Sequence, residues 1–208
     1  MNVQQGYNRW AEQYDSNQNK TRDLEAISLQ ETLAGTHFDS ILEIGCGTGK
    51  NSEWLQTIST VLTGIDLSEE MLAIARKKCI SKQIKFVQAD ILNDWHFVTG
   101  KYDLITFSLV LEHIEDLTSI FEKASAVLAD GGKIYMGELH PFKQYTGSKA
   151  RFETENGTEI VPCFNHHISD FSTAAKKAGL EVELITEHFD DNDRSGIPRI
   201  LTMLFSNR

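Results

Sequence analysis

The chain has 208 residues, of which 40% are hydrophobic and 24% are charged, an ordinary composition for a globular protein. That length predicts one domain with a substantial core and room for an insertion. The formal net charge of -10 argues against binding to duplex DNA, to structured RNA or to an anionic membrane surface. A small-molecule partner is therefore expected.

The sequence carries no segment typical of a membrane or secreted protein. No apolar run approaches the ~20 residues that span a bilayer, and the first residues lack the basic and apolar regions of a signal peptide. Cys46, Cys79 and Cys163 form no close pair, which predicts reduced thiols and a cytoplasmic location. Cys46 is better explained as a small packing residue than as a reactive thiol.

The first 35 residues are predicted to form two helices. Tyr7, Trp10, Ala11 and Tyr14 share one helical face. This face either docks on the rest of the domain or forms a lid that brings Tyr14 close to a ligand. A second amphipathic segment covers residues 24–33 and ends at a glycine. We treat residues 1–35 as a helical lid.

Strands and helices then alternate along the chain, a pattern typical of a doubly wound parallel sheet. The strand interiors are mainly apolar, as expected for strands covered on both faces. The predicted strands are residues 41–44, 61–65, 84–89, 102–108 and 133–139, and the predicted helices are 54–58, 68–78 and 117–128.

The regular alternation stops after residue 139. Residues 140–167 have no strong period and are predicted to be an insertion, with a short hairpin at 152–155 and 158–161. A helix at 168–178 precedes strands at 180–189 and 199–205, which suggest an antiparallel pair at one edge of the sheet. We expect residues 1–208 to form a single domain.

The stretch 41–49 ends a strand in the glycine turn G-x-G-x-G. A dinucleotide fingerprint has the longer spacing G-x-G-x-x-G, so the shorter turn favours a nucleoside without a pyrophosphate. Asp66 ends the second strand, where an acid accepts hydrogen bonds from ribose hydroxyls. Asp90 follows the third strand at the same edge and is a candidate acceptor for an adenine amino group.

Five ordered motifs resemble those of class I S-adenosylmethionine-dependent methyltransferases, nearest the small-molecule group that includes ubiquinone- and menaquinone-biosynthesis enzymes. The matching stretches are 41–49, 64–71, 87–91, 102–113 and 128–136, and residues 7–15 resemble the leading tyrosine-containing helix of that group. The resemblance implies a Rossmann-like α/β fold, doubly wound, with a seven-stranded, mostly parallel sheet and an antiparallel last strand.

The resemblance also implies a cofactor site for S-adenosyl-L-methionine. Glu43 and Gly45 are expected near the methionine part, Gly47 and Gly49 allow close approach, and Asp66 takes the ribose. Leu67 and Met71 flank the adenine, Asp90 and Ile91 read its amino edge, and Ser108 borders the sulfonium. Tyr14 and Cys46 complete the predicted set.

The expected reaction is in-line methyl transfer to a small-molecule acceptor, which needs mainly positioning and, for some acceptors, a general base. His140, at the end of the fifth strand, is the first candidate base, and His113 is the second; His166 and His167 also stay open, each with a structural interpretation. No zinc-like spacing is present, so no metal site is predicted.

Two other functions remain open at this point: a cofactor-binding module without catalysis, and a nicotinamide-dependent oxidoreductase, against which the missing third glycine argues. We expect a monomer or homodimer.

Overall fold

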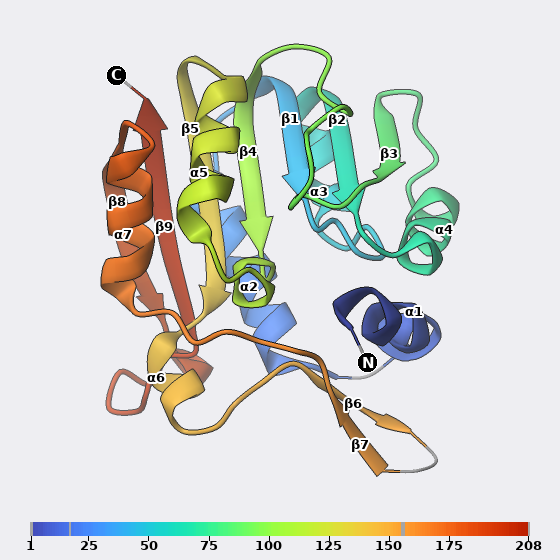
Figure 1. Cartoon of the computed structure of the whole chain (residues 1–208), viewed down its shortest axis with the longest axis vertical. Helices are drawn as coiled ribbons and strands as arrows, with labels where there is room; N and C mark the ends of the chain where they lie inside the picture. Colours follow the sequence, from blue (N-terminus) through green and yellow to red (C-terminus); the bar gives the residue numbers. More distant parts are fainter. Residues whose placement is uncertain (1, 17, 155–156, 208) are drawn as a thin grey trace.

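The computed structural model describes residues 2–16, 18–154 and 157–207. Its seven-stranded sheet has the order β3-β2-β1-β4-β5-β9-β8, which runs from right to left across Figure 1. The strands are β1 (Phe38–Ile44), β2 (Ser59–Asp66), β3 (Ile84–Gln88), β4 (Tyr102–Ser108), β5 (Leu128–Leu139), β8 (Leu180–His188) and β9 (Ile200–Asn207).

The sheet confirms the predicted topology. The pairs β1–β2, β1–β4, β2–β3 and β4–β5 are parallel, whereas β9 runs antiparallel to both β5 and β8. The last strand is therefore antiparallel, and it forms the expected antiparallel pair with β8 at one side of the sheet. Because β9 lies between β5 and β8, it is an interior strand.

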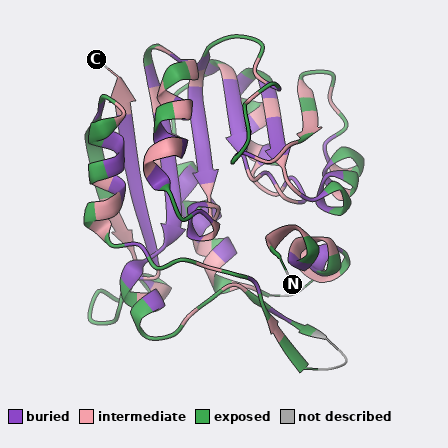
Figure 2. Ribbon diagram, in the orientation of Figure 1, coloured by how far each residue is buried: buried purple, intermediate pink, exposed green. Residues whose placement is uncertain are grey.

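Helices cover the sheet on both faces, and most of the central strands are buried (Figure 2). On one face α5 (Leu117–Val127) and α7 (Ile168–Lys177) contribute Phe121 and Phe171 to the larger core cluster. On the other, α2 (Lys20–Leu33) and α3 (Ser52–Leu55) contribute Leu29 and Leu55 to a second cluster. The central strands are almost continuously apolar because each of them packs against a core cluster on both faces of the sheet.

A third, smaller cluster attaches the N-terminal helix to the edge of the domain. Trp10 and Ala11 of α1 (Val3–Tyr14) pack with Met71 of α4 (Glu69–Lys78) and with Phe152 of the hairpin. The rings of Trp10 and Phe152 stack with their centroids 5.4 Å apart. The predicted aromatic face of α1 therefore makes contacts beyond its own helix, and α1 lies below the ends of β1 and β2 in Figure 1.

Several element bounds differ from the sequence expectations, and three differences change how an element is built. Strand β5 begins at Leu128 rather than at 133, and a register shift opposite Tyr102 and Leu104 absorbs the extra residues. The helix expected at 54–58 is split into α3 and a 3-10 turn, η1 (Gln56–Ile58). A short helix, α6 (Pro141–Tyr145), begins the insertion, with a proline at its first position.

The remaining elements are two 3-10 turns, η2 (Leu111–His113) and η3 (Asp190–Asn192), and a two-stranded sheet of β6 (Arg151–Thr154) and β7 (Gly157–Ile160). This pair corresponds to the predicted hairpin, of which residue 155 lies outside the described residues. None of the described helices is long and apolar enough to cross a membrane.

Candidate active site

A cavity lies where β1, β2 and β4 end, and α1 covers part of it. This is the edge at which open α/β sheets bind ligands. Of the predicted cofactor residues, nine line the cavity: Tyr14, Gly45, Gly47, Asp66, Leu67, Met71, Asp90, Ile91 and Ser108. The wall is completed by Val3, Tyr7, Ile44, Ile65, Ala89, Leu92, Leu109, Val110, His113 and Ile114.

The three glycines of the turn have three different tasks, although all have positive φ. A Cβ atom at Gly45 would lie 2.1 Å from Cγ2 of Val110, so Gly45 permits close packing. A Cβ at Gly49 would lie very close to Ala75 of α4 and to Cys79, which follows α4. Gly47 has open space beside it and lines the cavity, so it presents bare backbone to a ligand.

Asp66 is held in place by the same turn. Its Oδ2 accepts the Gly47 N–H at 2.8 Å, and its Oδ1 accepts the Ser68 N–H at 2.8 Å. A carboxylate oxygen has a second lone pair, so both oxygens can still accept from a pair of ribose hydroxyls. Burial raises the pKa of Asp66 to about 6, and the backbone N–H donors oppose that rise.

The far end of the cavity is suited to a flat, partly apolar ring. Leu67, Met71 and Ile91 line it, and Met71 is fully buried. Asp90 lies at the same end, where its Oδ1 accepts the Leu92 N–H at 2.9 Å. These surroundings match an adenine with a polar edge beside Asp90, so the residues present fit the nucleoside of S-adenosylmethionine.

Three predicted cofactor residues lie behind the cavity wall. Glu43 is buried and accepts a hydrogen bond from Ser52 Oγ, and burial raises its pKa to about 8. Cys46 is buried, with its Sγ close to where Gly64 would carry a Cβ. Glu43, Cys46 and Gly49 are not among the lining residues, so any direct contact with the cofactor stays a prediction.

His113 is the histidine that faces the cavity. Its Nδ1 lies 2.7 Å from the carbonyl of Pro162, which can only accept, so Nδ1 carries the hydrogen. Nε2 is then the acceptor of the neutral ring, and it lies 2.8 Å from the Tyr7 hydroxyl. Burial raises the pKa of Tyr7 well above its usual value, so Tyr7 keeps its proton and donates to Nε2.

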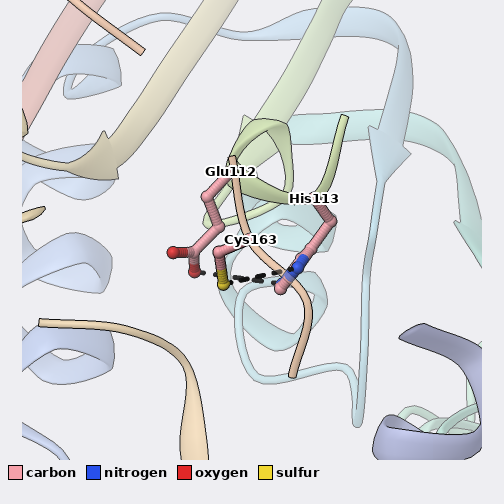
Figure 3. A group of neighbouring side chains, drawn as sticks. All are labelled: Glu112, His113 and Cys163. Atoms are coloured by element: carbon pink, nitrogen blue, oxygen red, sulfur yellow. Dashed lines mark hydrogen bonds and ion pairs between the residues drawn. The ribbon is translucent and has the colours of Figure 1, made fainter. Parts of the chain in front are cut away.

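Glu112, His113 and Cys163 form a cluster at this point, with their side chains directed toward one another (Figure 3). The ligand atoms lie within 4.8 Å of one another, yet both nitrogens of His113 already have hydrogen-bond partners. Burial raises the pKa of the Cys163 thiol to about 12, and the thiol donates to the Val161 carbonyl. A metal ion would have to displace these bonds and deprotonate the thiol.

The other candidate histidines have structural partners. His140 caps α6 by accepting the Phe142 N–H, and its Nε2 lies 3.0 Å from Glu187 Oε1. His166 is buried with Nε2 2.7 Å from the Ile114 carbonyl, and His167 lies 2.6 Å from the Tyr145 hydroxyl at the start of α7. None of the three lines this cavity or the second cavity that adjoins it.

A second cavity adjoins the first and shares Tyr7, Tyr14 and Leu109 with it. Leu109 follows β4 in a left-handed conformation, φ 56°, which a leucine rarely adopts. Backbone strain of this kind collects at functional sites. The second cavity reaches to residues 148–151 at the start of the hairpin.

Comparisons with known proteins point to one class of enzyme. A model of the family described as "Methyltransferase domain" matches residues 41–132, which include the glycine turn, Asp66 and Asp90. This match, the curated relatives and the solved structures together support a class I S-adenosylmethionine-dependent methyltransferase. Its cofactor is accordingly S-adenosylmethionine, and the sequence predictions of fold and of enzyme class are confirmed.

Curated relatives of this methyltransferase carry the name ubiquinone biosynthesis O-methyltransferase. The protein from Xanthomonas euvesicatoria is 28% identical over 168 residues, which are 77% of this chain and 69% of the relative. The protein from Hydrogenovibrio crunogenus is 33% identical over 150 residues, 68% of this chain and 61% of the relative. The matched region therefore spans roughly two thirds of these relatives' length.

Solved structures share the methyltransferase fold over nearly the whole chain. A methyltransferase from Mesorhizobium loti superposes with a TM-score of 0.73 at 21% identity, covering 88% of this chain and 98% of its own. An N-methyltransferase from Bradyrhizobium japonicum, solved with S-adenosyl-L-homocysteine, gives 0.75 at 20% identity and covers 100% and 99%. Neither the oxidoreductase nor the non-catalytic alternative is favoured by these findings.

Several lining residues of the methyltransferase were not predicted from the sequence. Leu109 and Val110 have no local signal, because an apolar residue after a strand is normally core. Tyr7 was placed on the lid helix, but its bond to His113 joins positions 106 residues apart. Only the folded topology brings those two side chains together.

Proposed function

We propose that this methyltransferase transfers the methyl group of S-adenosylmethionine to an oxygen of a small acceptor molecule. The bound cofactor supplies a methyl group already activated on a sulfonium. The names of the curated relatives support an oxygen acceptor. The negative net charge supports a small acceptor over a nucleic acid.

The observation that carries the proposal is the hydrogen-bonded state of His113. The Pro162 carbonyl keeps the hydrogen on Nδ1, so Nε2 is free to take a proton whenever Tyr7 moves or is replaced by an acceptor hydroxyl. His113 and Ser108 line the same cavity, at the end of β4 where the methyl group is expected. Nε2 of His113 would accept the proton of the acceptor hydroxyl, while the acceptor oxygen would bond to the methyl carbon and the bond from that carbon to the sulfonium sulfur would break, leaving its electron pair on sulfur.

Helix α1 is proposed to serve as a lid over both reactants. It contributes Tyr7 and Tyr14 to both cavities, and Gln4 donates to the Leu67 carbonyl at 3.0 Å. A lid that contacts the cofactor loop and the acceptor cavity excludes water from the transfer. Residues 1–35 and 140–167 would then form the acceptor half of one domain, acting as a monomer or homodimer in the cytoplasm.

The test has two stages. Calorimetric titration with S-adenosylhomocysteine is expected to show binding at micromolar to millimolar ligand. Incubation with labelled S-adenosylmethionine and a panel of phenols and aliphatic alcohols is then expected to give labelled product, which His113→Gln lowers by roughly 100-fold. The matched control His96→Gln changes an exposed histidine outside the lining residues.

Absence of S-adenosylhomocysteine binding at millimolar concentration would overturn the proposal. Binding without transfer to any acceptor of the panel would instead favour the non-catalytic module.

A further inference from the structure

The second cavity has a charge opposite to that of the whole protein. The chain contains 20 lysines and arginines against 30 acids. In the cavity lining, four cations, Arg22, Lys149, Arg151 and Arg199, face one acid, Glu112. A local reversal of sign inside a concave site concentrates anions there.

Two of the four cations already have tasks in the fold. Arg199 contacts both carboxylate oxygens of Asp190 and donates to Thr21 Oγ1 at 3.1 Å. Arg22 is buried, donates to the Tyr14 carbonyl, and its guanidinium lies 4.1 Å from the centroid of the Tyr14 ring. Tyr14 lines both cavities, so Arg22 contacts a residue of the cofactor cavity.

Lys149 and Arg151 are different. Neither forms an ion pair with another described residue. Both are exposed and lie where the chain enters the hairpin. Their neighbours Ser148 and Ala150 line the same cavity, so four consecutive residues form one wall. Phe152, next in the chain, is buried against Trp10, which anchors this wall to α1.

The cofactor brings one carboxylate of its own, on its methionine part. One cation suffices for that group, and we assign it to Arg22, which contacts Tyr14 of the cofactor cavity. Lys149 and Arg151 remain for a second anion. On the basis of the proposed function, we propose that Lys149 and Arg151 bind an anionic group, a carboxylate or a phosphate, carried by the methyl acceptor.

Glu112 does not oppose this assignment. It is buried beside His113, and burial raises the pKa of its carboxyl group. A carboxyl group that holds its proton more readily repels a neighbouring anion less. The acceptor's anionic group then lies at residues 149–151 while its hydroxyl reaches His113, and both anchors are connected through Tyr7 and Leu109.

The experiment measures anion binding to the full chain saturated with S-adenosylhomocysteine. Benzoate and phenyl phosphate are the probes, and benzamide is the neutral partner of benzoate. We expect at least one anion to bind at or below roughly 10 mM and more tightly than benzamide. The double variant Lys149→Gln/Arg151→Gln should weaken that binding by about 10-fold or more and reduce its dependence on salt.

A matched control removes the same charge elsewhere. Lys176→Gln/Lys177→Gln neutralises two exposed lysines at the end of α7, outside both cavities, and should leave anion binding unchanged. The titration with S-adenosylhomocysteine is repeated for both double variants, and its affinity should stay within about 2-fold.

The outcomes separate the two proposals. If the wild-type protein does not bind S-adenosylhomocysteine, the proposed function fails before any anion is added. If it binds but neither anion is preferred over benzamide, or the Lys149/Arg151 variant binds anions as well as wild type, the anion proposal is wrong. A loss of S-adenosylhomocysteine affinity in that variant would also overturn it, because these cations would then serve the cofactor.

Discussion

The Tyr7 hydroxyl of α1 lies 2.8 Å from Nε2 of His113. The two rings meet edge to face, with centroids 5.3 Å apart. Tyr7 lines both cavities and His113 lines the first, so the pair lies where we propose that the acceptor loses its proton. Replacing either partner therefore tests whether this bond has a catalytic or a structural task.

We expect Tyr7→Phe and His113→Gln to have unequal effects on methyl transfer. Tyr7→Phe removes the donor to Nε2 but leaves the base, so kcat should change by less than about 10-fold. His113→Gln removes the base and should lower kcat by about 100-fold. S-adenosylhomocysteine affinity, measured by calorimetry, should be preserved in both; equal losses of kcat would contradict this division.

Asp66 gives a prediction with a pH dependence. We expect its ionised form to accept the ribose hydroxyls, and because burial raises its pKa to about 6, the free protein loses that form as pH falls. S-adenosylhomocysteine affinity should therefore rise from pH 5 to pH 7 and then level off. Asp66→Ala should weaken binding by at least about 10-fold at pH 7, a loss of roughly 1.4 kcal/mol or more.

Two variants sharpen the test of Asp66. Asp66→Asn keeps the shape of the side chain but cannot titrate, so its weaker binding should no longer change between pH 5 and 7. Asp94→Ala removes an exposed acid outside the cavity lining and should bind as wild type does. A pH dependence that persists in Asp66→Asn would assign the titration to another group.

His140 was the first candidate base from the sequence, and its surroundings now predict a different result. His140→Ala removes the cap of α6 and the contact with Glu187, which should cost about 1 kcal/mol of stability. Transfer activity of the folded variant should be unchanged, and His140→Asn should recover part of the stability by restoring a cap. A kcat loss as large as that of His113→Gln would make His140 the preferred candidate for the general base.

The spacing of residues along the sequence carries more information about the proposed cofactor half of the site than about the proposed acceptor half. Gly45, Gly47 and Asp66 belong to one strand–turn–helix unit, so their spacing along the chain determines their spacing in the fold. By contrast, Tyr7 and His113 meet only because α1 crosses the ends of the strands. Lys149 and Arg151 lie in an irregular segment, where no periodicity indicates which way a side chain points.

In the glycine turn, a second substitution should restore part of the stability that a first one removes. Gly45→Ala places a Cβ 2.1 Å from Val110 Cγ2 at a positive φ, which should destabilise the protein by about 2 to 4 kcal/mol. Adding Val110→Ala removes the clash, so the double variant should be more stable than Gly45→Ala alone. Thermal unfolding measures both. Strict additivity of the two single substitutions would show that the clash is absorbed elsewhere.

Gly47→Ala is the matched comparison in the same turn. Nothing lies within 4 Å of its added Cβ, so only backbone strain of about 1 kcal/mol is expected in stability. Its main effect should be weaker S-adenosylhomocysteine binding, because the new methyl group occupies space that the cofactor approaches.

Two buried glutamates predict that stability falls as pH rises. The Glu138 carboxylate accepts the N–H groups of Val110 and Leu111, and burial raises its pKa to about 8, as it does for Glu43. The folded protein therefore holds these protons more tightly than the unfolded chain, whose glutamates titrate near 4.5. The resulting stability is fully present below about pH 4.5 and is lost as pH rises through about 8.

Chemical denaturation between pH 5 and 9 measures this loss, which we expect to reach a few kcal/mol because each pKa unit corresponds to about 1.4 kcal/mol. Glu138→Gln keeps an acceptor for both N–H groups and stays neutral, so it should lose roughly half of the pH dependence. Glu122→Gln, an exposed glutamate of α5, should retain all of it. Wild-type stability that is constant or increases over this range would show that the two carboxyl groups are ionised in the folded protein at neutral pH.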